Sequence, residues 1–278
     1  SSVRLLVVHV GAEEHIIVLN IHHIATDGWS TAYLLTDVAL AYNALVAGGS
    51  VDLGPAPVVR YADYAQWQRA VLADEARMEP HMRYWREALG GELPVLELQT
   101  DHPRPALMSL EGGSANVEVG AAAAAALQAL CRECGTTMMR GALAMWAAVL
   151  GKHSGQSDVV VGIPYANRED PATHAVVGYF VTMLAVRLAV DGKSSFRELV
   201  AGAGSAMNDA LAHAEVPFMR VVEAVAPVRD GSRTPIFQTM LGFTEAGGWG
   251  EIGAVLHHLT VAPVLDVESD INAARHST

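Results

Sequence analysis

Residues 22–30 have the sequence HHIATDGWS and separate a predicted strand from a predicted helix. The apolar, β-branched run before them, Ile16 to Ile21, predicts a buried strand. After them, apolar residues recur at helical spacing from Ser30, the expected N-cap, until Gly48 and Gly49. The stretch is therefore expected to be a tight loop between a strand and a helix.

Four residues of this loop could carry chemistry. Adjacent side chains at the end of a strand point in different directions, so only one of His22 and His23 should face a cleft. Asp27 could cap backbone donors or pair with an arginine, and Gly28 leaves room for a substrate. A neutral imidazole can take or orient the proton of an attacking amine. A buried pair of histidines without a catalytic role is the alternative.

The remaining pattern alternates helices and strands. A long helical segment is predicted from Tyr61 towards Leu89, and proline and glycine from Val95 to Ser114 indicate a connector. We therefore expect two lobes, residues 1–105 and 106–278. Later elements are predicted as helices at Ala121–Cys134, Arg140–His153 and, behind a Ser195/Glu198 capping box, to about His213, and as strands at Asp158–Ile163, Gly178–Val190 and Pro235–Phe243.

Composition excludes several classes of function. The chain has 278 residues, 51% of them hydrophobic, and a net charge of −12, which disfavours nucleic acid and anionic membranes as partners. No apolar run reaches the roughly 18 residues of a spanning helix, and Ser1 to Leu6 do not resemble a secretion signal. We expect a soluble, cytoplasmic protein in which Cys131 and Cys134 are free thiols and no metal is bound.

The loop resembles the HHxxxDG signature of the condensation domains of nonribosomal peptide synthetases. Further stretches resemble other blocks of that family, and they occur in the family's order. They are Tyr61–Gln68 (YxDYAxWQ), Ser154–Arg168 (ending in GxPxxxR), Gly178–Val181 (GFFVN), His213–Val222 (HxDVPFxxLV) and Pro227–Gln238 (RDxSRxPLFQ). Five further blocks in order make the resemblance specific from Ile16 to Phe243.

The resemblance implies an α/β (α+β two-layer sandwich) fold with chloramphenicol-acetyltransferase-like lobes around a tunnel. The second histidine, His23, would act on the acceptor amine as a general base or a positioning group, beside His22. Asp27 would be structural and pair with a distant arginine, Arg168 or else Arg187; a simple turn and helix cap is the other possibility for Asp27. The remaining expected site residues are Gly28 and the substrate contacts Trp29, Ser30 and Gln238.

The resemblance also implies the reaction and its partners. Donor and acceptor carrier proteins would deliver two thioesters on phosphopantetheine arms, with an adenylation domain adjacent and no cofactor bound directly. The product would be an amide in secondary-metabolite or antibiotic biosynthesis, and Gly28 with Trp29 favours the subtype that joins two L-configured units.

The chain departs from the family at its start. Only 21 residues precede His22, where family members carry over a hundred, so we expect an incomplete N-terminal lobe and leave the activity of this chain by itself open. Thr182 and Met183 also replace the usual Asn-Thr.

Two other functions fit part of the pattern. Gly28 to Ala32 imitates a nucleophile elbow, which would make Ser30 the nucleophile of a serine hydrolase, although no oxyanion segment precedes it. A docking module that binds carrier domains without making bonds is the other alternative.

Overall fold

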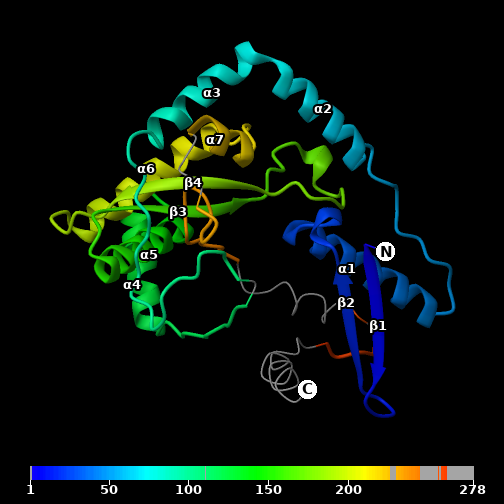
Figure 1. Cartoon of the computed structure of the whole chain (residues 1–278). Coiled ribbons are helices and arrows are strands. Elements are labelled where there is room, and N and C mark those ends of the chain that lie inside the picture. The colour runs from blue at the N-terminus through cyan, green and yellow to red at the C-terminus, as the bar shows by residue number, and fades with distance from the viewer. Residues whose placement is uncertain (1, 110, 226–229, 245–255, 257, 262–278) are drawn as a thin grey trace. The chain divides into compact units, whose positions relative to one another are not determined.

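The computed structural model describes residues 2–109, 111–225, 230–244, 256 and 258–261, and its elements are drawn in Figure 1. Contacts divide the chain into two compact units. The first unit contains residues 1–65, 168–180 and 244–278, and the second contains residues 66–167 and 181–243. This division does not follow the sequence order of the expected lobes, whose boundary near residue 105 stays a prediction.

The first unit begins with an antiparallel hairpin that leads into the HHIATDGWS loop. Strand β1 (Val3–His9) pairs with β2 (His15–Ile21), in a register that sets Leu5 opposite Leu19 and Val7 opposite Ile17. A one-turn 3-10 helix, His23–Ala25, and helix α1 (Gly28–Val46) follow. The sequence predicts β2 but not β1.

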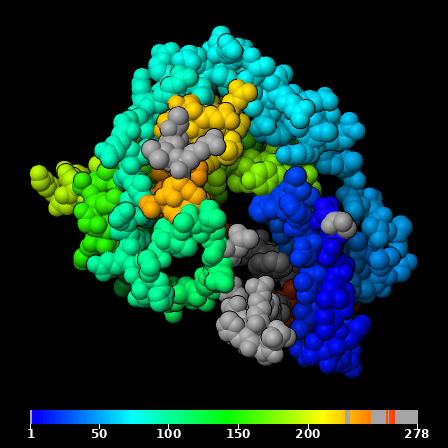
Figure 2. Space-filling model, viewed as in Figure 1, coloured from blue at the N-terminus to red at the C-terminus, as the bar shows by residue number. Residues whose placement is uncertain are grey.

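The prediction that the Ile16–Ile21 strand is buried is wrong. Leu5 is 64% exposed and Ile17 is 66% exposed, and Figure 2 shows the hairpin at the surface in blue. A two-stranded ribbon has no second layer of its own, so its apolar side chains stay accessible wherever no other element covers them.

The second unit holds helices around a two-stranded sheet. Its elements are α2 (Tyr61–Ala73, which begins in the first unit), α3 (Glu75–Ala88), α4 (Ala121–Glu133), α5 (Met138–Ser154), β3 (Asp158–Tyr165), β4 (Thr182–Ala189), α6 (Phe196–Ala212) and α7 (Phe218–Val225). Helices α5 and α6 pack on each other and on the antiparallel β3–β4 sheet (Figure 1). This mixture of helices and strands agrees with the expected fold class.

The core of this unit lies between that sheet and its helices. Leu143 and Leu150 of α5 are buried, as their helical spacing predicts, together with Val161 of β3 and Val200 of α6. The capping box predicted for α6 is present: the side chain of Ser195 accepts from the Glu198 backbone, and the Glu198 side chain accepts from the Ser195 backbone. None of the helices in the described ranges combines the length and apolarity needed to cross a membrane.

Two predicted elements differ strongly in the structure, and the strand expected from Gly178 to Val190 is shorter, Thr182–Ala189. The helix expected from Tyr61 to Leu89 is split at Asp74, whose extended backbone and carboxylate cap α3 by accepting from Arg77 N. The strand expected from Pro235 to Phe243 is reduced to one isolated parallel bridge between Gly162 and Met240. Ile236 has a positive φ of 69°, which breaks the extended run.

Candidate active site

Asp27 organises the beginning of α1. Its extended backbone makes it the N-cap, and its Oδ1 accepts hydrogen bonds from Ser30 N at 2.8 Å and Ser30 Oγ at 2.7 Å. The expectation that Ser30 is the N-cap is therefore wrong by three residues: Gly28 is already helical, and the shorter reach from Asp27 to the first orphan N–H groups decides the cap.

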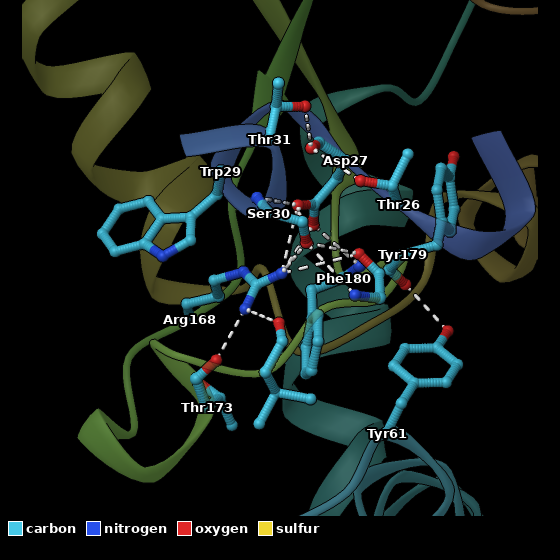
Figure 3. A network of polar contacts seen from close by, with 12 residues as sticks. Thr26, Asp27, Trp29, Ser30, Thr31, Tyr61, Arg168, Thr173, Tyr179 and Phe180 are labelled. Carbon is cyan, nitrogen blue, oxygen red and sulfur yellow. Dashed lines mark hydrogen bonds and ion pairs between the residues drawn. The ribbon is translucent and has the colours of Figure 1, made fainter. Parts of the chain in front are cut away.

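Arg168 meets Asp27 as a buried ion pair (Figure 3). Its Nη2 lies 3.0 Å and 3.2 Å from the two carboxylate oxygens, and the exposed fractions of the two side chains are 1% and 2%. Its Nη1 donates to the carbonyls of Thr173 at 2.6 Å and Val176 at 2.7 Å. Phe180 lies 4.0 Å from the guanidinium, measured to the ring centroid. The pair ties residues 168–180 to the HHIATDGWS loop.

Arg187, the other arginine considered for Asp27, has a different partner. Its Nε and Nη2 donate to the carboxylate of Asp158 at 2.7–3.1 Å, and its Nη1 donates to Gly90 O at 2.8 Å. Asp27 therefore does more than cap a helix, since it also neutralises a buried guanidinium.

The ionised form of Asp27 is favoured despite its burial. Burial alone raises the pKa of a carboxyl group, but hydrogen bonds from Ser30 and from Phe180 N, together with the charge of Arg168, outweigh it. The net result is a pKa below the ordinary value for aspartate. Asp27 is thus a fixed negative charge at neutral pH and cannot serve as a general acid there.

Ser30 completes the network instead of facing a substrate. It is fully buried, and its Oγ accepts from Arg168 Nη2 at 2.8 Å and from Gly178 N at 3.1 Å. These contacts are at odds with the expected substrate contact. They also count against a hydrolase that uses Ser30, because a nucleophile must be accessible and beside a base.

The two histidines are both exposed, so the alternative of a buried histidine pair is wrong. His22 Nδ1 accepts from Ile24 N at 3.1 Å and caps the 3-10 turn. The His23 ring has no hydrogen-bond partner within the described residues and packs edge-on against Tyr179, with 5.3 Å between the ring centroids. Of the two, His23 is the one with neither ring nitrogen hydrogen-bonded to a described residue, whereas Nδ1 of His22 is occupied.

The other expected site residues fall into two groups. Gly28 is exposed, and a Cβ there would meet no atom within 4 Å, so the described chain leaves space beside it. Trp29 is 40% exposed and donates from Nε1 to His174 O at 3.0 Å. Gln238 belongs to the second unit, where its Oε1 accepts from Leu96 N at 2.7 Å. The side-chain amide of Gln238 therefore hydrogen-bonds the backbone at Leu96.

Sequence reasoning missed the contribution of Tyr61 and Tyr179. Tyr61, which the sequence marks only as the start of a helical segment, donates from its hydroxyl to Tyr179 O at 2.8 Å, and its ring packs on Phe180 (Figure 3). The signal was present in the two family-like blocks that contain these residues, but their spacing of 118 residues gives no hint that the blocks touch.

Comparisons with known proteins agree with the fold. The family described as the condensation domain matches residues 1–249, and the chain belongs to that family. The resemblance inferred from the motifs is confirmed.

The relatives of the chain include large peptide synthetases. Malpinin synthetase of Mortierella alpina is 38% identical over 241 residues, which are 87% of this chain and 3% of that protein. Phosphinothricin tripeptide synthetase PhsC of Streptomyces viridochromogenes is 33% identical over 253 residues, 91% of this chain and 23% of that protein. The chain thus spans a small part of the length of these relatives.

Solved structures agree with the fold. The X-domain from teicoplanin biosynthesis matches with a TM-score of 0.77 and 27% identity, over 86% of this chain and 54% of that chain. A four-domain nonribosomal peptide synthetase bound to AMP and glycine matches with a TM-score of 0.79 and 27% identity, over 94% of this chain and 19% of that chain.

Proposed function

We propose that the chain catalyses amide bond formation between a donor acyl or peptidyl thioester and the amine of an acceptor aminoacyl thioester. One observation carries the proposal: the buried Asp27–Arg168 pair fixes the HHIATDGWS loop, in which His23 presents an exposed imidazole without a hydrogen-bond partner in the described chain. Membership of the condensation domain family supports the reaction class.

In the proposed reaction the acceptor nitrogen attacks the donor carbonyl carbon. The carbon–sulfur bond breaks, the sulfur leaves as a thiol, and the amine loses one proton. His23 takes or orients that proton, because a neutral imidazole nitrogen can accept a hydrogen bond from the attacking amine. Asp27 stays ionised and positions the loop.

The partners that we propose are two carrier proteins. Their phosphopantetheine arms hold both thioesters, so the chain itself needs no bound cofactor, and an adenylation domain would load the acceptor. Similarity to a four-domain nonribosomal peptide synthetase supports this setting. Gly28 with Trp29 supports the joining of two L-configured units.

The test is a single-turnover assay with the intact protein that carries this sequence. Donor carriers loaded with an L- or a D-aminoacyl group are mixed with an L-loaded acceptor, and intact mass spectrometry follows both arms. The proposal predicts an emptied donor arm and a dipeptidyl acceptor arm, formed faster from the L-donor. Equal rates from both donors would remove the L-to-L assignment while leaving the reaction class standing.

A second candidate is a docking module that makes no bonds. It is favoured by the similarity, with a TM-score of 0.76 and 27% identity, to the X-domain in its complex with OxyB from teicoplanin biosynthesis. Binding of loaded carriers without any dipeptidyl product, across several donor and acceptor pairs, would support this candidate over the first.

A further inference from the structure

We propose that Tyr179 is the positioning residue that orients His23, and that the Asp27–Arg168 network acts on His23 through it. The proposal rests on the proposed function for its catalytic meaning. It starts from one contact in the first unit, the edge-to-face packing of the two rings at 5.3 Å and an interplanar angle of 83°. An edge-to-face contact fixes the plane of an aromatic ring as well as its distance.

The contact matters because His23 has little else to hold it. Its side chain is exposed, and no described residue hydrogen-bonds its ring. An imidazole in that situation samples several rotamers, whereas proton transfer needs a nitrogen within hydrogen-bond reach of the amine. The Tyr179 ring, packed on one side of the imidazole, reduces the number of orientations that His23 can adopt.

The backbone around Tyr179 is itself held in place by hydrogen bonds at three consecutive residues, 178–180. Gly178 N donates to Ser30 Oγ at 3.1 Å, and Phe180 N donates to Asp27 Oδ2 at 3.0 Å. Between them, Tyr179 O accepts from the Tyr61 hydroxyl at 2.8 Å (Figure 3). The backbone on both sides of Tyr179 is therefore fixed by the network that caps α1.

The sequence at Gly178 agrees with this close arrangement. A Cβ built at Gly178 would lie 2.4 Å from Cδ2 of the Tyr61 ring, so only glycine lets Tyr61 approach the segment. Tyr61 and Gly178 together set the position from which the Tyr179 side chain extends to His23. The buried ion pair thereby has a mechanical connection to the exposed imidazole.

The first experiment measures the contact without any assay of activity. In the unmodified chain with labelled histidine and tyrosine rings, an NOE between the His23 and Tyr179 ring protons is expected, with the His23 resonance assigned from its loss in His23→Asn. In Tyr179→Leu the ring-current contribution to the His23 shift disappears, and in Tyr179→Phe it is retained. Absence of the NOE would overturn the proposal.

His174 provides an internal control in the same spectra. It lies in the same 168–180 segment as Tyr179, and its ring packs against Trp29. An unchanged His174 resonance in Tyr179→Leu shows that the segment has kept its structure. If His174 moves as well, the NOE in the unmodified chain decides the question.

The second experiment joins the contact to the reaction. Tyr179→Leu is expected to lower the single-turnover amide rate about 10- to 100-fold with carrier binding unchanged, and Tyr179→Phe to restore it. A preserved NOE together with a rate that does not depend on His23 would sink the proposed function and leave the contact standing. A full rate in Tyr179→Leu, with His23→Ala inactive, would overturn the positioning role alone.

Discussion

Asp27 illustrates how one carboxylate serves two structural purposes. It caps α1 and it neutralises Arg168, and both roles are compatible because each oxygen accepts more than one hydrogen bond. The pairing with Arg168 was expected from the family-like motifs and not from the residues themselves, since 141 positions separate the two side chains. The burial of Ser30 was not predictable at all, because a serine near a helix start is usually solvated.

Replacement of Asp27 by asparagine should strongly destabilise the first unit. The substitution leaves the guanidinium of Arg168 buried without a counter-charge, for which we expect a loss of about 3–5 kcal/mol in the free energy of unfolding. Urea unfolding of Asp27→Asn and of the half-buried control Asp37→Asn measures the difference. A loss equal to that of the control would show that the pair contributes little.

The same carboxylate predicts an acid-sensitive fold. Since the folded pKa of Asp27 lies below its ordinary value of 3.8, its contribution is complete above that value and is lost as the pH falls through the folded pKa. Stability followed by circular dichroism from about pH 6 to about pH 2 should therefore drop more steeply for the unmodified chain than for Asp27→Asn. Parallel curves would contradict this assignment.

Helix ends show what can be predicted for single elements. The α6 capping box is visible as Ser195 followed by Glu198, because cap and helix are local in sequence. The break at Asp74 was not predicted because helical periodicity continues on both sides of it. The strand predicted from Pro235 to Phe243 is absent because Ile236 has a positive φ, which has no signal in the sequence.

The α6 cap supports a quantitative prediction. Ser195→Ala removes an acceptor for the Glu198 N–H and should lower the free energy of unfolding by about 1 kcal/mol. Ser194→Ala, one residue earlier, is the matched control and should cost less. Denaturant unfolding of both variants checks the prediction, and equal losses would show that the box does not stabilise α6.

The junction between α3 and the end of α6 should respond to mildly acidic pH. His213 Nδ1 lies 3.0 Å from His81 Nδ1, and Tyr84 stacks on the His213 ring at 4.2 Å. Burial, followed by the neighbouring His81, lowers the pKa of His213, against an opposing effect of Asp209. Only one of the two Nδ1 atoms can carry a proton in this hydrogen bond, so the bond breaks when both atoms are protonated.

Because the folded pKa of His213 lies below 6.5, the folded state binds fewer protons than the unfolded state, and stability falls as the pH drops below that value. Urea unfolding from about pH 7.5 to about pH 5.5 should show this loss in the unmodified chain and a smaller one in His213→Asn. Glu215 pairs with Arg77 and lies 3.6 Å from His81, and it is present in both the unmodified chain and His213→Asn. An identical pH dependence would exclude His213 as its source.

At the scale of the molecule, the two units differ in how they bury apolar surface. The buried helix–sheet core of the second unit could be predicted from its apolar helices and β-branched strands. The exposure of the hairpin could not, because an apolar strand has the same sequence whether or not another layer covers it.

The exposed hairpin face should bind apolar dyes. Leu5 and Ile17 share one face by register, so Leu5→Lys with Ile17→Lys should lower the fluorescence of bound anilinonaphthalene sulfonate and change the free energy of unfolding by less than about 0.5 kcal/mol. Asn20→Lys adds charge without removing apolar surface and is the control. A large loss of stability would show that these side chains are buried in solution.

The most direct test of the account compares His23→Ala with His22→Ala in the single-turnover amide assay with loaded donor and acceptor carriers. The His23 imidazole has no hydrogen-bond partner among the described residues, whereas His22 caps a backbone N–H. We predict a rate loss of about 10²- to 10⁴-fold for His23→Ala and less than about tenfold for His22→Ala, with carrier binding retained in both. Equal rates in His23→Ala and the unmodified protein would contradict the proposal that His23 acts on the acceptor amine.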